Sequence, residues 1–288
     1  MNHPSDRLLA ANEHRGSPSC VGIDPVLDRL PDECRRSASG AVPAIEAFCK
    51  GVLEAISGTV PVCKFQSACF ERHGPDGVRL LDRLCAFARE RGIEVILDFK
   101  RGDIGISAKH YAASALERAD WVTVNPYLGV DGITPFVGEV GEPTGLGAFA
   151  LVRTSNPGGD AIQSLQLTDG RTVADAVADL IAHMGEGSMG ASGYSALGAV
   201  VGATKSEDAA RLRARMPAQL FLVPGFGAQG GGVDDVLACF NSDGRGALVT
   251  ASRSVIYAFE GTSTGWQHAI ETAATDFART LSQGLGVS

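Results

Sequence analysis

Short apolar segments alternate with longer amphipathic ones along the whole chain. The apolar segments are rich in Val, Ile, Leu or aromatic residues and are nearly continuous rather than alternating. Such runs are typical of parallel strands that are buried on both faces. We therefore predict eight strands, at Cys20–Asp24, Val60–Phe65, Ile93–Asp98, Trp121–Asn125, Ala148–Val152, Leu197–Gly202, Leu220–Pro224 and Ala247–Ala251.

The segments between these strands have the hydrophobic spacing of helices. Eight strands, each followed by a helix, predict an α/β fold, a single (β/α)8 TIM barrel spanning residues 1–288. A doubly wound open sheet is the alternative that the same alternation permits. No composition break divides the chain, so we expect one domain. The predicted helices are Pro43–Ser57, Pro75–Arg91, Ser107–Arg118, Val173–Met184, Ser206–Met216 and Gly265–Gln283, with shorter ones at Gly129–Gly138 and Val233–Phe240.

Two connections are longer than the simple pattern requires. Asn156–Arg171 carries two turn signals and a predicted extended excursion at Leu165–Leu167. Gly185–Gly193 contains a Gly-x-Gly-x-x-Gly string, which resembles a dinucleotide fingerprint. The string follows a predicted helix and precedes a predicted strand, whereas the fingerprint follows a strand and opens a helix. We interpret both segments as loop insertions.

Composition and charge narrow the class of protein. The net charge of −8 argues against a nucleic-acid partner or an anionic membrane surface. No apolar run reaches the length of a membrane span, and the N-terminal residues lack the layout of a signal peptide. The seven cysteines form no Cys-x-x-Cys pair, so neither a disulfide framework nor a zinc ribbon is indicated. We expect a cytoplasmic enzyme with reduced thiols.

Charged residues concentrate where the third predicted strand ends. In a barrel the active site forms at the carboxyl ends of the strands. Asp98 and Lys100 are two residues apart, so on an extended segment they share a face. Lys64 ends the neighbouring strand, and Asp103 follows where the next helix begins. A salt-bridge network is the structural alternative, but crowded charges are costly to desolvate, which favours a catalytic site.

The residues around this cluster resemble a known family. Ile96-Leu97-Asp98-Phe99-Lys100-Arg101-Gly102-Asp103-Ile104 resembles the Asp-x-Lys-x-x-Asp signature of orotidine 5′-phosphate decarboxylases, closest to their bacterial type-2 branch. Five further blocks resemble that family in the same order. They are Cys20–Pro25, Lys64–Gln66, the Thr154–Gly158 pyrimidine loop, the Pro224–Gly231 phosphate loop and Ser252–Ser254.

The resemblance implies a cofactor-free, metal-free carboxy-lyase that converts orotidine 5′-monophosphate into uridine 5′-monophosphate, the last step of pyrimidine nucleotide synthesis. It also implies a homodimer in which Asp103 enters the site of the partner subunit. Lys100 would protonate C6 of the substrate, and Asp98 would lie beside the departing carboxylate. The implied binding residues are Asp24, Lys64 and Ser107 for the ribose, Ser155 for the pyrimidine, and Gln229 and Arg253 for the phosphate.

Physical chemistry supports these roles independently. Decarboxylation leaves an electron pair on a ring carbon, and a fixed ammonium stabilises that charge and then supplies a proton. Binding of the remote phosphate can close the glycine-rich Gly225–Gly232 loop and orient the ring.

Two other functions are possible for the same pattern. A related magnesium-dependent branch of sugar-phosphate decarboxylases and aldolases shares the signature but carries a glutamate where this chain has Lys64. A lysine at that position repels a divalent cation. A non-catalytic nucleotide-binding barrel is the second alternative, although such a protein has no need of the Lys64, Asp98, Lys100 and Asp103 row. His73, His110 and His183 show no metal-ligand spacing, so we expect no metal.

Overall fold

Parallel strands close a barrel, and this excludes the open sheet. The computed structural model describes residues 3–36, 38–139, 142–203, 206–227, 232–261 and 265–286. Within these ranges eight strands pair in a ring, and the first strand also pairs with the last. In ring order they are β1 (Ser19–Ile23), β2 (Val62–Gln66), β3 (Glu94–Arg101), β4 (Trp121–Val124), β7 (Gly147–Arg153), β8 (Leu197–Val201), β9 (Phe221–Pro224) and β10 (Ala247–Ala251).

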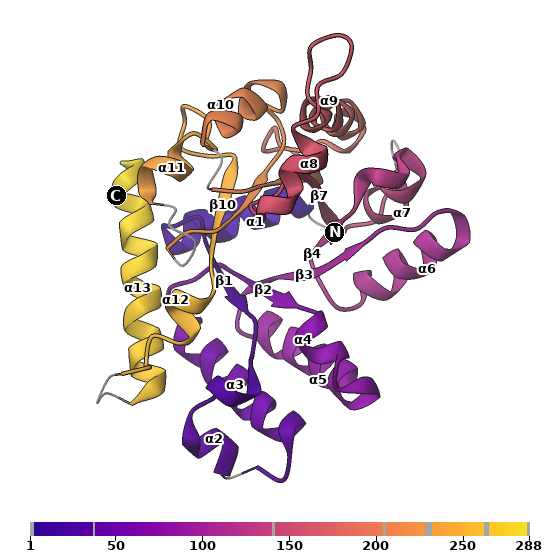
Figure 1. The fold of residues 1–288 in the computed structure, drawn as a ribbon. Helices are drawn as coiled ribbons and strands as arrows, with labels where there is room; N and C mark the ends of the chain where they lie inside the picture. The colour runs from indigo at the N-terminus through magenta and orange to yellow at the C-terminus, as the bar shows by residue number, and fades with distance from the viewer. Residues whose placement is uncertain are drawn as a thin grey trace.

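Helices surround the barrel close to their predicted positions (Figure 1). Residues 129–138 are different from the prediction, because a 3-10 turn (η3, Val130–Gly132) precedes the single-turn helix α7 (Thr134–Val137). Short helices α2 (Asp32–Arg36), α4 (Ala68–Glu71) and α12 (Arg253–Ile256) were not predicted. The longer helices are α3 (Ala41–Ile56), α5 (Gly74–Arg89), α6 (Gly105–Leu116), α9 (Val173–Gly185), α10 (Ser206–Arg215) and α13 (Trp266–Leu285), with the short α11 at Val233–Leu237.

Two apolar clusters hold the barrel together. One lies between the strands and the surrounding helices, and the other fills the interior of the barrel. In the interior the Trp121 and Phe149 rings stack with their centroids 4.5 Å apart. Gly147 makes this packing possible, because a Cβ there would lie 2.3 Å from the Trp121 ring. Burial of such large rings contributes much of the stability of a core.

An unpredicted helix, α1 (Pro4–Arg15), closes the end of the barrel where the strands begin. Its Leu8 and Leu9 side chains belong to the interior cluster. Pro4 lies in its first turn, and Gly16 ends it in the left-handed conformation, which are the usual signals at the two ends of a helix. These signals were present in the sequence. No helix among the described residues is long and apolar enough to cross a membrane.

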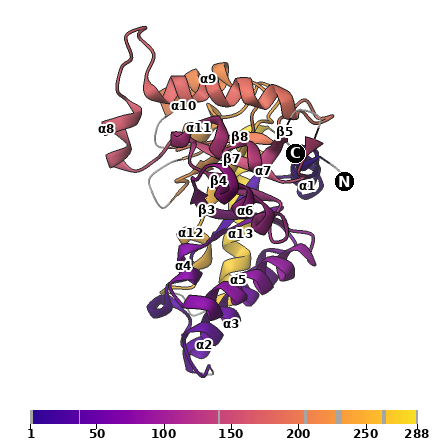
Figure 2. The ribbon, with the colours of Figure 1, turned by 90° about the vertical axis from the view of Figure 1, so that its right-hand side faces the viewer.

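The two insertions lie at opposite ends of the barrel. Residues 156–171 contain a 3-10 turn (η4, Pro157–Gly159), the helix α8 (Asp160–Gln163) and an antiparallel bridge between Gln166 and Thr172. The bridge lies in the predicted extended excursion, and the segment projects away from α1 (Figure 2). Residues 185–193 lie beside α1, where Asp6 accepts hydrogen bonds from the backbone of Ala191 and Ser192. This position agrees with a connecting loop.

Candidate active site

A cavity of about 600 Å³ opens where the strands end. Six of the predicted site residues line it, and they come from the ends of five different strands. Asp24 and Ser155 follow β1 and β7, Lys64 lies within β2, and Asp98 and Lys100 belong to β3. Arg253 opens α12 directly after β10. The other lining residues include Thr123, Leu151, Ile162, Gln163, Val200, Leu222 and Ser252.

Asp98 lies between two lysine ammonium groups. Its Oδ2 is 2.8 Å from Lys64 Nζ, and its Oδ1 is 2.6 Å from Lys100 Nζ. Lys64 Nζ is also 3.9 Å from Asp24 Oδ1. The side chains of Lys64 and Asp98 are each 7% exposed, whereas that of Lys100 is 45% exposed and faces the cavity. Three residues of the predicted row, Lys64, Asp98 and Lys100, therefore lie together, and Asp24 rather than Asp103 extends the row.

The charges in this row fix each other's ionisation. Burial alone would raise the pKa of Asp98, but the charges of Lys64 and Lys100 outweigh it and hold that pKa well below its usual range. Burial would lower the pKa of Lys64, but the charges of Asp98 and Asp24 raise it above its usual value. Both groups therefore stay ionised around neutral pH.

The backbone at Lys100 is different from the extended segment that we predicted. Lys100 has a φ of 44°, and it is the one non-glycine residue with positive φ in the described part of the chain. The pairing of β3 with β4 also shifts register between Leu97 and Arg101. A lysine in this conformation costs free energy, which the surrounding contacts must offset. The shared face of Asp98 and Lys100 thus results from a bulge rather than from simple alternation.

Thr123, which the sequence analysis missed, supports this bulge. It lies on β4 and is buried. Its Oγ1 donates to Asp98 Oδ1 at 2.8 Å and accepts a hydrogen bond from the Lys100 backbone N–H at 3.0 Å. A single hydroxyl therefore orients both residues. A threonine inside an otherwise apolar strand was the signal that could have revealed it.

The loop after β7 covers one side of the cavity. Ser155 lies where β7 and β8 meet, and a Cβ at Gly202 would be 2.9 Å from the Ser155 backbone. The adjacent Arg153 is buried, and Gln163 lines the cavity from α8. Neither Arg153 nor Gln163 is among the predicted site residues.

The predicted phosphate side is described in part. Arg253 is exposed to the cavity at the start of α12. Gly22 on β1 allows Ser252 to approach, because a Cβ there would be 1.9 Å from Ser252 Oγ. Gln229 and its neighbours at 228–231 lie outside the described residues.

Asp103 and Ser107 do not line the cavity of their own chain. Asp103 is half-buried just before α6, and its Oδ1 accepts a hydrogen bond from the Ile104 N–H at 2.8 Å. Ser107 lies in the first turn of α6. Asn125 accepts a hydrogen bond from the Tyr127 N–H and so serves a backbone group.

Comparison with known proteins identifies the family. A profile described as the orotidine 5′-phosphate decarboxylase / HUMPS family matches residues 19–263. The chain belongs to this family. An orotidine 5′-phosphate decarboxylase from Rhodopirellula baltica is 41% identical over 93% of this chain and 95% of that protein. Another from Clostridium perfringens is 36% identical over 89% of each chain.

Solved structures of this family have the same fold. The structure of the Leishmania donovani OMP decarboxylase is 29% identical in sequence and has a TM-score of 0.81. The match covers 99% of this chain and 100% of that chain. The crystal structure of a putative orotidine 5′-phosphate decarboxylase from Streptomyces avermitilis is 35% identical in sequence and has a TM-score of 0.83. The match covers 99% of this chain and 97% of that chain.

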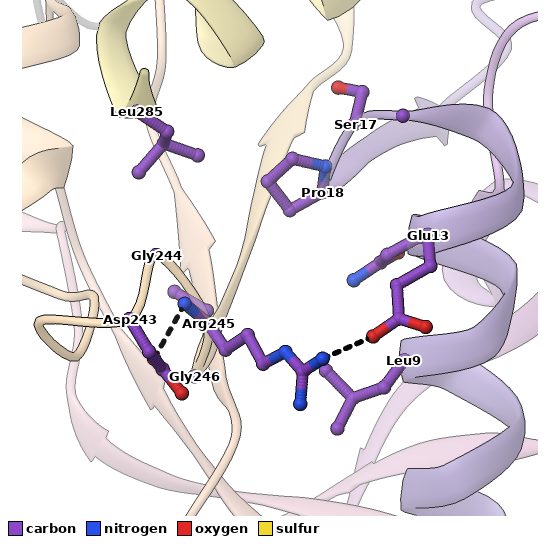
Figure 3. A pocket seen from close by; sticks show the side chains of 12 residues that line it. Leu9, Glu13, Ser17, Pro18, Asp243, Gly244, Arg245, Gly246 and Leu285 are labelled. Atoms are coloured by element: carbon purple, nitrogen blue, oxygen red, sulfur yellow. Dashed lines mark hydrogen bonds and ion pairs between the residues drawn. The ribbon is translucent and has the colours of Figure 1, made fainter. Parts of the chain in front are cut away.

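A second cavity, of about 370 Å³, lies at the opposite end of the barrel (Figure 3). Leu9, Pro18 and Leu285 give it a mainly apolar wall, and Arg245 pairs with Glu13 at 2.6 Å beside it. It contains no lysine and none of the residues in the family signature. Asp98 and Lys100 of the family signature line the cavity where the strands end, which is therefore the candidate active site.

Proposed function

We propose that this chain decarboxylates orotidine 5′-phosphate to uridine 5′-phosphate, with Lys100 as the proton donor. The observation that carries the proposal is the buried Asp98 carboxylate between Lys64 and Lys100 at the end of β3. Relatives at 36–41% identity over most of the chain are named orotidine 5′-phosphate decarboxylase, which supports the same activity here. The enzyme is a carboxy-lyase that requires no cofactor.

The reaction needs one proton and a fixed positive charge. The bond between C6 and the carboxylate carbon breaks, CO₂ leaves, and the electron pair stays on C6. The Lys100 ammonium stabilises this charge and then transfers a proton from Nζ to C6. Asp98 and Thr123 hold Lys100 in place before the reaction, so little reorganisation is needed. The Lys100 side chain is 45% exposed, so solvent can return its proton after product release.

The rest of the cavity binds the nucleotide. Asp24 and Lys64 bind the ribose, and Ser155 recognises the pyrimidine. Arg253 binds the phosphate together with Gln229, at the usual phosphate position of such barrels, after the last two strands. The guanidinium of Arg253 suits this role because it donates two parallel hydrogen bonds.

A homodimer completes each site with Asp103 and Ser107 of the partner subunit. An exposed apolar surface next to Asp103 supports this part of the proposal. It is formed by residues of α6 and of two neighbouring 3-10 turns, η2 (Pro126–Leu128) and η3. We call it the α6 patch, and its members are Ile104, Ile106, Tyr127, Leu128 and Val130. Contiguous apolar patches of this kind mark interfaces, and a second copy seated here would carry Asp103 toward the neighbouring cavity.

The magnesium-dependent branch of the family fits the cavity less well. A divalent cation prefers several carboxylate or carbonyl oxygens. Here both oxygens of Asp98 already accept hydrogen bonds from lysines, and Lys64 occupies the position next to Asp24. The positive charge of the two lysines instead suits an anionic substrate.

The free thiols of the cysteines support a cytoplasmic location. All seven cysteines are free, and six of them are buried. Burial raises the pKa of the Cys20 thiol to about 12, so it stays protonated and unreactive. Free buried thiols of this kind are usual where glutathione keeps proteins reduced.

The direct test is CO₂ release from orotidine 5′-phosphate with and without EDTA, for the wild type and Lys100→Ala. We expect turnover that is insensitive to EDTA and that falls by at least about 10²–10⁴-fold in the variant. No turnover by folded wild-type protein would refute the proposal. EDTA-sensitive action on a sugar phosphate would move the chain to the magnesium-dependent branch.

A further inference from the structure

Arg153 joins the loop over the cavity to the outer ring of helices. It is the last residue of β7 and is buried. Its guanidinium lies 2.7 Å from Asp160 Oδ1 on α8 and 2.7 Å from Asp208 Oδ2 on α10. It also donates to Gln163 Oε1 at 3.3 Å. One side chain at the end of a barrel strand therefore holds two carboxylates and an amide from elements far apart in the sequence.

The loop that Arg153 holds is also closed on itself. Gln163 Oε1 accepts a hydrogen bond from the Thr154 N–H at 2.9 Å, and its Nε2 donates to Thr154 Oγ1 at 2.8 Å. Thr154 Oγ1 in turn donates to Asn156 Oδ1 at 2.7 Å. The first and last residues of 154–163 are thus tied together, and Ser155 lies between the tied groups. We call residues 154–163 the β7 loop.

The β7 loop presents both polar and apolar groups to the cavity. Ser155, Ile162 and Gln163 all line it. Ile162 is an exposed apolar side chain at the wall of the cavity, so a flat ring bound there would cover it. Without the contacts of Arg153, a ten-residue loop rich in glycine would populate many conformations, and few of them would present these three side chains together.

We propose that Arg153 is a positioning residue that holds the β7 loop in its binding arrangement before the nucleotide arrives. This inference rests on the proposed function, because it takes Ser155 as the group that recognises the pyrimidine. Arg153 does not line the cavity itself and acts through Asp160 and Gln163. When only a fraction of molecules has a competent loop, the apparent affinity for substrate falls by that fraction. The tether therefore lowers KM, whereas the chemical step stays with Lys100.

The two carboxylates can be separated experimentally. Asp160 belongs to the β7 loop, and its side chain is 46% exposed, so its removal leaves the barrel intact. Asp208 lies on α10 and also pairs with Arg211 at 2.6 Å, so it anchors Arg153 to the outer ring. Asp160→Ala removes the charged contact on the loop side of the tether and leaves the longer Gln163 hydrogen bond. It also keeps the Arg153–Asp208 pair, which satisfies the buried guanidinium.

The test compares Asp160→Ala with Glu13→Ala in the full-length protein. Glu13 also forms a short ion pair with an arginine, Arg245, but at the opposite end of the barrel (Figure 3). We expect Asp160→Ala to raise amide hydrogen exchange of residues 154–163 about tenfold in the free protein. We also expect KM for orotidine 5′-phosphate to rise about tenfold while kcat changes less than about twofold. Glu13→Ala should change neither quantity.

Three outcomes would overturn the proposal. They are unchanged exchange in folded Asp160→Ala, an equal effect of Glu13→Ala, and a fall in kcat with unchanged KM. Asp160→Glu keeps the charge and should restore most of the protection, which a general loss of stability would not. A wild type without turnover would refute the proposed function, yet the exchange comparison on free protein would still decide whether Arg153 orders the loop.

Discussion

Asp98 accepts hydrogen bonds from three side chains, Lys64, Lys100 and Thr123. Its negative charge is shared by two ammonium groups, and its own side chain is only 7% exposed. The energy of such a set depends on every member, because removing one partner leaves the others buried and unbalanced. Single residues here therefore affect stability and activity together.

Asp98→Asn should show this coupling. The amide removes the charge between Lys64 and Lys100, so two ammonium groups face each other without a carboxylate between them. We expect turnover to fall by roughly 10²–10⁴-fold and the free energy of unfolding to fall by about 3–5 kcal/mol at pH 7. Steady-state kinetics and urea unfolding measure the two effects, and wild-type turnover in a folded variant would contradict the role of Asp98.

The lowered pKa of Asp98 also predicts how that stability depends on pH. A carboxyl whose pKa is lower in the folded state contributes stability above its unfolded pKa, and this is lost as the pH falls through its folded pKa. The stability difference between the wild type and Asp98→Asn should therefore shrink as the pH falls below about 4. Unfolding series at several pH values would test this, and a constant difference would argue against it.

Thr123→Val isolates the hydroxyl that orients the row. The substitution keeps the shape of the side chain but leaves the Lys100 N–H without its acceptor and Asp98 with one donor fewer. We expect a loss of about 1–3 kcal/mol in the free energy of unfolding and a fall in kcat larger than any rise in KM. Thr123→Ser keeps the hydroxyl and should retain most activity, so equal defects in both variants would contradict the hydroxyl's role.

At the scale of elements, β3 has a different task at each end. Its last residues carry the charged row, whereas its first residue, Glu94, contacts α1 through Arg7 at 3.6 Å. Asp120 lies beside Glu94, pairs with Arg7 and Arg89 at 3.5 Å and accepts the Val95 N–H at 3.0 Å. Burial, followed by the charge of Asp120, raises the pKa of Glu94 to about 7.

This raised pKa makes the contact between β3 and α1 pH-dependent. When the pKa of a carboxyl is higher in the folded protein than in the unfolded chain, its ionisation destabilises the fold. This loss of stability grows as the pH rises from the unfolded pKa to the folded pKa. At pH 8 we therefore expect Glu94→Gln to unfold at a higher temperature than the wild type. We expect its free energy of unfolding to be higher by about 1–2 kcal/mol. The advantage should disappear near pH 4.5. Calorimetry across this range would measure it, and a difference independent of pH would exclude the mechanism.

At the scale of the whole molecule, the α6 patch has to be covered for the proposed site to be complete. Ile106 is 71% exposed and Tyr127 is 85% exposed in the single chain. Both have large side chains whose surface is mostly apolar. Asp103 lies beside them and does not reach the cavity of its own chain. Burial of the patch against a second copy would stabilise a dimer through the hydrophobic effect.

Ile106→Asp should separate the copies. A buried carboxylate at an apolar interface is costly to desolvate, so we expect a shift from dimer to monomer in analytical ultracentrifugation. We also expect kcat/KM to fall steeply, because the proposed site would then lack Asp103 and Ser107 of the partner subunit. Lys109→Asp, an exposed position on the same helix outside the patch, is the control. A fully active monomer would contradict the shared site.

The sequence by itself determined the positions of the strands and of the charged row. Apolar runs that are buried on both faces are a local signal, so the predicted strands matched the observed ones to within a few residues. Lys64, Asp98 and Lys100 could be grouped because the ends of neighbouring parallel strands meet at one edge. The family signature added the roles, and it depends only on residue identity and spacing.

The tertiary structure alone decided the contacts between distant segments. Barrel closure depends on the pairing of β1 with β10, which no local pattern records. The positive φ of Lys100 results from the bulge between β3 and β4, and Thr123 acquires its role only because that bulge places it beside Asp98. Arg153 meets Asp208 across 55 residues of sequence, and it pairs with the nearby Asp160 as well. Hydrogen bonds and ion pairs act over a few ångströms, so only the folded chain determines which polar groups lie close enough to form them.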